Sequence, residues 1–127
     1  MKKFMVFFLI IGGLYQYAGD KIGLQPLLNY AKRHPEKPWA SQVYYSVGMI
    51  YYQQSQLPKS QEVLTTLLTD FPTGQYTARA LLRLSEVAYD NRDYATTRTM
   101  IERFLEEYPD HPGVDMAIKR RELLYNK

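Results

Sequence analysis

The stretch from Tyr44 to Pro72, YYSVGMIYYQQSQLPKSQEVLTTLLTDFP, decides the fold. Its apolar and aromatic residues recur at helical spacing on both sides of a polar break at Ser55-Gln56, which predicts two amphipathic helices folded back on each other. Gly48 supplies a small residue where the two helices would pack closely. Pro72 closes the unit, because proline cannot continue a helix.

The same arrangement recurs 37 residues later in the chain. The segment LLRLSEVAYDNRDYATTRTMIERFLEEYP, residues 81–109, has Ser85 as its small residue and ends at Pro109. One step back from Pro72 reaches Pro35, which closes a weaker third copy, GLQPLLNYAKRHP. An internal repeat of this kind indicates a helical solenoid, in which stacked hairpins bury one another's apolar faces.

The expected fold class is therefore all-α, a short solenoid of antiparallel helix hairpins behind an N-terminal apolar segment. We expect a signal peptide or membrane anchor at residues 1–18 and a helical repeat domain at 19–127. The domain's expected units are a partial repeat at 19–37, a repeat at 38–74, a repeat at 75–111 and a capping helix at 112–127.

The N-terminal segment admits three interpretations. Lys2 and Lys3 precede an apolar run over residues 4–14, which matches a secretory signal better than a membrane span of about 17 to 25 residues. Extension through Tyr15 and Tyr17 would instead make a retained anchor. The repeat register would also allow a packing helix of the earliest repeat. The first two interpretations place the rest of the chain outside the cytoplasm.

Composition excludes several classes of protein. The 127 residues are 46% hydrophobic and 14% aromatic, enough for one small folded domain rather than a disordered chain. A net charge of +3 from interspersed basic and acidic residues gives no nucleic-acid footprint. The absence of cysteine excludes disulfides, thiolate metal sites, a cysteine nucleophile and a cysteine-borne lipid.

The sequence also shows no constellation typical of catalysis. His34 and His111 each precede a proline and have no further ligands at metal-binding spacing. The acidic cluster of Glu106, Glu107 and Asp110 is interpreted as a solvated face, since no apolar cleft surrounds it. There is no glycine-rich phosphate loop and no nucleophile motif. We expect no enzyme activity, no catalytic residue, no cofactor and no metal.

The recurring positions resemble the tetratricopeptide repeat (TPR) family. Its pattern falls on Tyr44, Val47, Gly48, Tyr51, Ser60, Leu64, Leu67 and Pro72, and again on Leu81, Leu84, Ser85, Ala88, Thr97, Ile101, Phe104 and Pro109. Ser60 and Thr97 replace the family's alanines, and the step exceeds the usual 34 residues. The longer linkers FPTGQY and HPGVD resemble those of bacterial envelope TPR proteins, such as the outer-membrane β-barrel assembly lipoprotein and the Tol–Pal-associated coordinators.

The resemblance implies protein binding on a concave face formed by the first helix of each repeat. By register this face carries Gln42, Tyr45, Met49, Tyr52, Gln53, Arg79, Leu82, Glu86, Tyr89 and Asp90. Tyrosine, methionine and arginine are favoured at interfaces, where they bury much area. An alternative for Tyr45 and Tyr52 is packing on a neighbouring helix.

The expected capping helix has its own pattern. Met116, Leu123 and Leu124 are expected to face inward, and Asp110 to cap the helix. The basic residues Lys119, Arg120, Arg121 and Lys127 are interpreted as a solvated face, or alternatively as a contact for anionic lipid or an acidic partner.

The expected function is a non-catalytic scaffold or adaptor at the bacterial envelope, linked to outer-membrane protein assembly. Its partners would be envelope or membrane-complex proteins, with no nucleic acid and with membrane association through residues 4–18. It would lie in the periplasm, or be anchored facing it. The alternative is a structural accessory subunit of a membrane complex, held by a retained N-terminal helix.

Overall fold

A computed structural model describes residues 24–127, and every regular element in that range is helical. The elements are α2 (Gln25–Arg33), α3 (Ala40–Gln53), α4 (Leu57–Asp70), α5 (Thr77–Asp90), α6 (Tyr94–Glu107), α7 (Val114–Leu123) and the 3-10 helix η2 (Leu124–Asn126). The signal or anchor expected at residues 1–18 lies outside the described residues.

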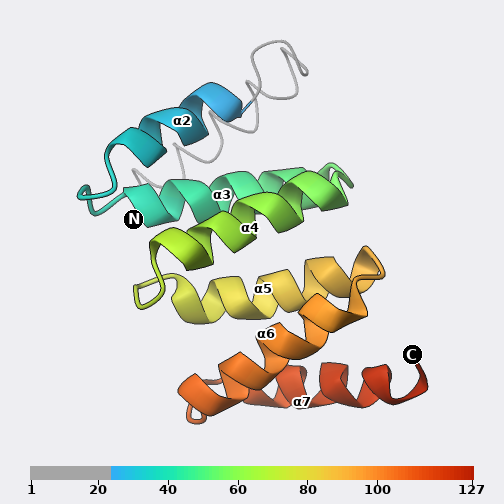
Figure 1. Ribbon diagram of the computed structural model, residues 1–127. Helices are drawn as coiled ribbons and strands as arrows, with labels where there is room; N and C mark the ends of the chain where they lie inside the picture. The colour runs from blue at the N-terminus through green and yellow to red at the C-terminus, as the bar shows by residue number, and fades with distance from the viewer. Residues whose placement is uncertain (1–23) are drawn as a thin grey trace.

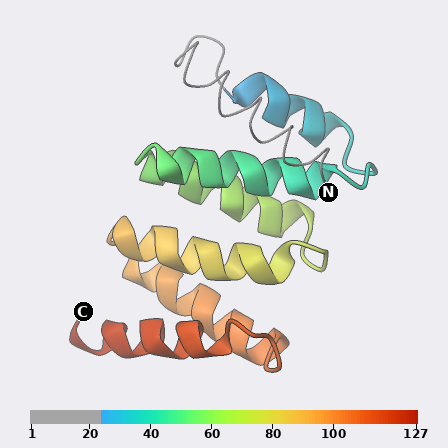
Figure 2. The ribbon, with the colours of Figure 1, turned by 180° about the vertical axis from the view of Figure 1, so that it is seen from behind.

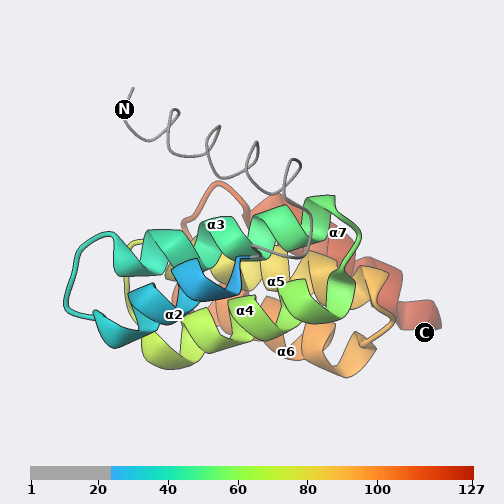
Figure 3. The same ribbon diagram turned by 90° about the horizontal axis from the view of Figure 1, so that it is seen from above.

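The helices stack in chain order, with α2 at one end and α7 at the other (Figure 1). Each helix packs mainly on the helix before it and the helix after it. Viewed along the stack, α3, α5 and α7 form one layer and α2, α4 and α6 form the other (Figure 3). We call α3, α5 and α7 the A helices and the surface of their layer the A-helix face. This face is turned toward the viewer in Figure 2. This is the hairpin stacking that the 37-residue step predicts.

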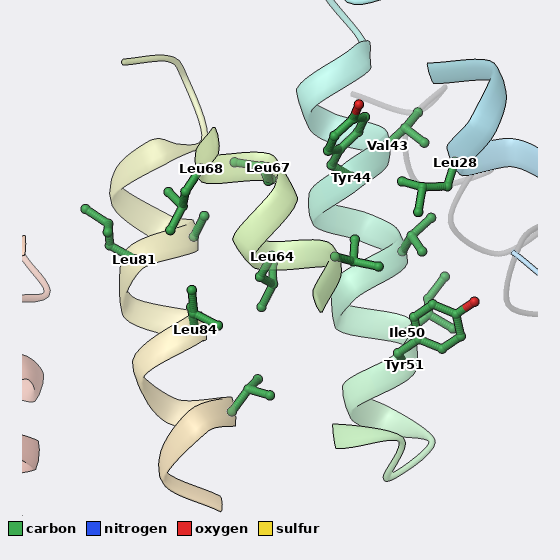
Figure 4. Close-up of a cluster of buried hydrophobic side chains, with 14 of the residues drawn as sticks. Leu28, Val43, Tyr44, Ile50, Tyr51, Leu64, Leu67, Leu68, Leu81 and Leu84 are labelled. Atoms are coloured by element: carbon green, nitrogen blue, oxygen red, sulfur yellow. The ribbon is translucent and has the colours of Figure 1, made fainter. Parts of the chain in front are cut away.

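The core runs continuously through the stack. Figure 4 shows apolar side chains from α2 to α5 forming one cluster, with Leu64 and Leu67 of α4 fully buried in it. Burial of a leucine side chain contributes about 1.5–3 kcal/mol relative to exposure. Tyr44 is also fully buried, and its hydroxyl donates a hydrogen bond to Asp70 Oδ2 at 2.9 Å. The hairpins therefore share one core rather than each having its own.

The first hairpin closes most tightly at Gly48. A Cβ placed there would lie 2.8 Å from Leu64 Cδ2 and 2.9 Å from its Cγ, closer than atoms pack. The buried Ser60 hydroxyl donates to the Gly48 carbonyl oxygen at 2.7 Å, which satisfies a polar group at the position where the TPR pattern has alanine. The absence of a side chain at Gly48 thus sets the separation of α3 and α4.

Helices α3 and α5 each end in a turn with one residue in the left-handed region. Ser55 and Arg92, 37 residues apart, both have φ of 60°. After α3 the amide of Gln56 donates to the Tyr51 carbonyl oxygen at 2.9 Å and that of Ser55 to the Tyr52 carbonyl oxygen at 3.0 Å. The same pair of bonds follows α5, and together they define a Schellman motif.

Side chains join the two full hairpins at the side of the stack where α3 and α5 end. The Gln61 amide donates to Asp93 Oδ2 at 2.6 Å and accepts from Asn91 Nδ2 at 3.1 Å. Asp93 also caps α6, accepting from the Thr96 amide at 3.2 Å and its hydroxyl at 2.7 Å. These bonds, led by the Thr96 hydroxyl, lower the pKa of Asp93 below its ordinary value.

Two helix starts differ from the sequence expectation. The sequence predicts a helix from about Gln75, but α5 begins at Thr77. The Thr77 hydroxyl donates to the Phe71 carbonyl oxygen at 2.9 Å and accepts from the Gly74 amide at 2.7 Å, which holds the loop before the helix. α7 begins after Gly113 without a side-chain cap, and the expected capping role of Asp110 is wrong.

The expected inward face of the last helix is also partly wrong. Leu124 is buried as predicted, together with Ala117, but Met116 and Leu123 are each 55% exposed. α7 packs on α6, and the core receives Ala117, the partly buried Val114 and, from η2, Leu124. Met116 and Leu123 lie outside this core.

Replacing Gly48 with alanine should lower the free energy of unfolding by about 1–2 kcal/mol. Overpacking a core costs about 1–3 kcal/mol, which exceeds the helix-propensity gain of about 1 kcal/mol. Gly74→Ala is the matched control, because its Cβ would meet no atom closer than 3.7 Å. Urea unfolding measures both variants. The destabilisation should shrink when Leu64→Val is also present, and an undiminished loss would refute the Leu64 contact as its cause.

Replacing Ser55 with glycine should stabilise the protein by about 0.5–1 kcal/mol. The left-handed conformation costs a residue with a Cβ about 1–2 kcal/mol, part of which is offset by the greater freedom of glycine in the unfolded chain. Gln54→Gly, one residue earlier at φ of −87°, should destabilise by about the same amount. Thermal unfolding measures both variants. A shift of the unfolding temperature in the same direction for Ser55→Gly and Gln54→Gly would contradict this explanation.

Candidate functional site

The A-helix face contains a pocket of about 300 Å³. α5 supplies most of its lining, and the neighbouring helices α3 and α7 supply the rest. The lining residues are Tyr45 from α3, Arg79, Leu82, Arg83, Ser85 and Glu86 from α5, and Met116, Ala117 and Arg120 from α7. The pocket therefore depends on three helices that are distant in sequence but share one layer.

The small and apolar part of the lining comes from Leu82, Ser85 and Ala117. Ala117 and Ser85 are buried, and Leu82 is half-buried. The Ser85 hydroxyl donates to the Leu82 carbonyl oxygen at 2.6 Å, so its proton is used within α5. This arrangement gives the pocket an apolar character without a free nucleophile.

Three arginines make the pocket electropositive. Arg83 Nη1 lies 3.1 Å from Glu86 Oε2, while Arg79 sits over the Tyr76 ring at 5.7 Å and Arg120 is half-buried. The hydrogen bond to Tyr45, together with the Glu86 carboxylate, raises the pKa of Arg83 above its ordinary value. Glu86 is the one acidic residue in the lining, so positive charge exceeds negative charge there.

A tyrosine fastens α3 to α5 beside the pocket. The Tyr52 hydroxyl lies 2.6 Å from Asp90 Oδ2 and 3.0 Å from Glu86 Oε1, and its one proton is shared between these two acceptors. Burial of the phenol, followed by these hydrogen bonds and the negative charge of the two carboxylates, raises the pKa of Tyr52 above its ordinary value. We call Tyr52, Glu86 and Asp90 the clasp. The two carboxylates at this end of the A-helix face are thus already bonded within the protein.

The ten residues predicted for the concave face all lie on α3 or α5, and none is buried. Four of them, Tyr45, Arg79, Leu82 and Glu86, line the pocket. Tyr52 and Asp90 belong to the clasp, and Tyr89 meets Tyr94 edge-on at 5.5 Å. Gln42, Met49 and Gln53 lie in the same layer outside the pocket. The structure does not test whether these residues bind protein.

The alternative role for two of the tyrosines is also present in the structure. Tyr45 packs its ring on Tyr76 at 5.3 Å and bonds to Arg83, and Tyr52 bonds to α5. Both side chains remain partly exposed. Packing on the neighbouring hairpin and exposure on the A-helix face are therefore compatible.

Sequence reasoning did not assign five of the lining residues to the concave face: Arg83, Ser85, Met116, Ala117 and Arg120. Arg120 was named only in the alternative of a basic contact for anionic lipid or an acidic partner. The repeat itself carried the signal, because one 37-residue step leads from Arg83 to Arg120 and from Arg79 to Met116. Treating α7 as a third A helix, rather than as a cap alone, would have placed both on this face.

Residues 24–127 hold no group of three or more side chains arranged to ligate a metal. His111 Nδ1 accepts from the Gly113 amide at 2.9 Å and its ring packs on Phe104, whereas His34 packs on Tyr30. Over the same range no helix combines the length and apolarity needed to cross a membrane.

The stacked hairpins and their shared A-helix face define a TPR-like helical repeat protein. Residues 39–121, more than half of the chain, match the family model YfiO, described as outer membrane lipoprotein, and the chain belongs to this family. A 74-residue stretch is 27% identical to the outer membrane protein assembly factor BamD of Pasteurella multocida (strain Pm70). That match covers 58% of this chain but only 28% of the relative. No solved structure gave a significant match.

Replacing Tyr52 with phenylalanine should reduce the loss of stability at high pH. A folded-state pKa above the unfolded value contributes stability below the unfolded pKa of 10.0, and this contribution disappears as the pH rises. Wild type should therefore lose unfolding free energy more steeply than Tyr52→Phe once the pH rises past about 10, which a series from about pH 9 to about pH 11 would show. At neutral pH the variant should be less stable by about 0.5–1.5 kcal/mol.

Tyr125→Phe is the control for this measurement, because Tyr125 is 81% exposed. Its denaturant unfolding curves should follow those of wild type across the pH range. Equal alkaline slopes for wild type and Tyr52→Phe would show that the clasp does not perturb the Tyr52 hydroxyl.

Proposed function

We propose that this protein is a non-catalytic scaffold of outer-membrane protein assembly, which binds partner proteins on its A-helix face. The observation that carries the proposal is the family match over residues 39–121, the same region that builds α3, α5 and the pocket. The relative's name, an outer membrane protein assembly factor, gives the process. Because the matched stretch is a small part of that relative, the relative's role is carried over as a proposal.

The chemistry of the A-helix face supports binding rather than catalysis. Tyr45, Met49 and Arg120 present an aromatic ring, a flexible thioether and a guanidinium on one accessible layer. These side-chain types form energetic centres of protein interfaces because they combine large contact area with specific hydrogen bonding. The partners would be other proteins of the assembly, met on the periplasmic side of the outer membrane.

The alternative, a structural subunit held by a retained N-terminal helix, depends on residues 4–18. Those residues lie outside the described part of the chain. We favour the scaffold because its support, the A-helix face and its pocket, lies within the described residues.

Depleting the protein from its native cells should lower the amount of folded β-barrel protein in the outer membrane. Folded barrels are measured by their heat-modifiable mobility on denaturing gels. Wild type should restore them, whereas the double variant Tyr45→Ala/Met49→Ala should restore less than half, because truncation removes two contact side chains from α3.

The matched control is Thr99→Ala/Glu102→Ala, which truncates two exposed residues of α6 in the opposite layer and should complement fully. Circular dichroism confirms that both variants fold. An unchanged amount of folded β-barrel protein after depletion would refute the assembly role. Full complementation by Tyr45→Ala/Met49→Ala would refute the A-helix face as the binding surface.

A further inference from the structure

We propose that the pocket between α5 and α7 binds an acidic segment of a partner protein. The segment would place a carboxylate among Arg79, Arg83 and Arg120 and an apolar side chain against Leu82 and Met116. This inference rests on the proposed function, that the A-helix face binds protein, and it names the chemistry of the segment that the pocket selects.

The first support is an imbalance of charge at the pocket. Its lining holds three guanidinium groups and one carboxylate, Glu86, which is already bonded to Arg83 and to Tyr52. Within residues 24–127 no ion pair joins Arg79 or Arg120 to a carboxylate. Arginine presents a planar fork that fits a carboxylate with two parallel hydrogen bonds. An acidic side chain would complete this arrangement.

The second support is the way the fold redistributes the basic residues. Lys119, Arg120, Arg121 and Lys127 are close in sequence, but Lys127 reaches over the Tyr94 ring at 5.6 Å and only Arg120 enters the pocket. Arg120 instead joins Arg83, one repeat earlier. Guanidinium groups that converge on a recess favour a protruding protein side chain, whereas a bilayer surface is met by charges spread over an open face.

The third support is apolar surface directly beside the charge. Met116 is 55% exposed and lines the same pocket as Leu82 and Ala117. Methionine adapts its shape to a bound side chain, and apolar surface next to arginine is typical of interface centres. A segment with only acidic residues would leave this surface exposed to water, so the expected segment is acidic and apolar together.

The A-helix face also orients the segment. Arg79 lies in the first turn of α5 and Asp90 is its last residue, with Tyr52, Glu86 and Asp90 joined in the clasp. Negative charge on a ligand is attracted toward the N-terminal half of α5 and repelled from its C-terminal end. The carboxylate of the segment therefore lies toward Arg79 rather than toward Asp90.

A photo-crosslinking residue, p-benzoylphenylalanine, placed at position 123 of the full chain in its native cells tests the proposal. Leu123 is exposed and, at helical spacing, lies on the same face of α7 as Met116 and Arg120. It does not itself line the pocket. The expected adduct maps by mass spectrometry to a partner segment that carries carboxylates next to apolar residues. Arg120→Glu should reduce the adduct at least tenfold, because it places like charge opposite the segment.

The matched control is Arg98→Glu, the same charge reversal at an exposed residue of α6, which should change the adduct less than twofold. Reversing the charge of the mapped carboxylates to arginine should restore the adduct with Arg120→Glu. An adduct that maps to a neutral or basic segment, that is insensitive to Arg120→Glu, or that contains lipid overturns the proposal.

A second crosslinking position at Met49 separates this inference from the proposed function. Protein adducts at position 49 without any at 123 would overturn the acidic-segment pocket and leave the scaffold role standing. The absence of protein adducts at both positions would overturn both.

Discussion

The approach of α3 to α4 at Gly48 is the contact on which the rest of the stack depends. Leu64 occupies the space that a side chain at Gly48 would need, and Ser60 bonds to the Gly48 carbonyl oxygen across the same crossing. Because this contact sets how the first hairpin closes, it also sets where α4 offers its apolar stripe to α5. The A-helix face, and the pocket on it, follow from that placement.

The elements that the sequence predicted well are those governed by local chemistry. Proline spacing and helical periodicity predicted repeats at 38–74 and 75–111, and each of these ranges forms a pair of helices, α3 with α4 and α5 with α6. The start of α5 was misjudged because it depends on the hydrogen bond from the Thr77 hydroxyl to the Phe71 carbonyl oxygen, which helical periodicity does not reveal. The inward face of α7 was misjudged because Met116 and Leu123 are apolar by type, yet the packing of α7 against α6 leaves both outside the core.

The candidate site was predictable to the extent that it follows from repeat register. The residues assigned to α3 and α5 lie in the expected layer because each of these helices is the first helix of its repeat and the two are related by the 37-residue step. Arg120 and Met116 could not be found by inspecting α7 alone, where a basic run indicates a solvated face. They become members of the site only when α7 is compared with α5 one repeat earlier, and only the fold shows that Lys127 leaves the group.

The clasps between hairpins have a consequence for recognition. Tyr52 joins α3 to α5, and Gln61 joins α4 to the turn before α6, both at the side of the stack where α3 and α5 end. In the proposed binding, a surface held by such bonds needs less ordering, which leaves more of the contact energy for affinity. The same bonds oppose a change in its shape around a poorly fitting chain. Discrimination between partners would then come from rejecting the wrong shape, rather than from adapting to many.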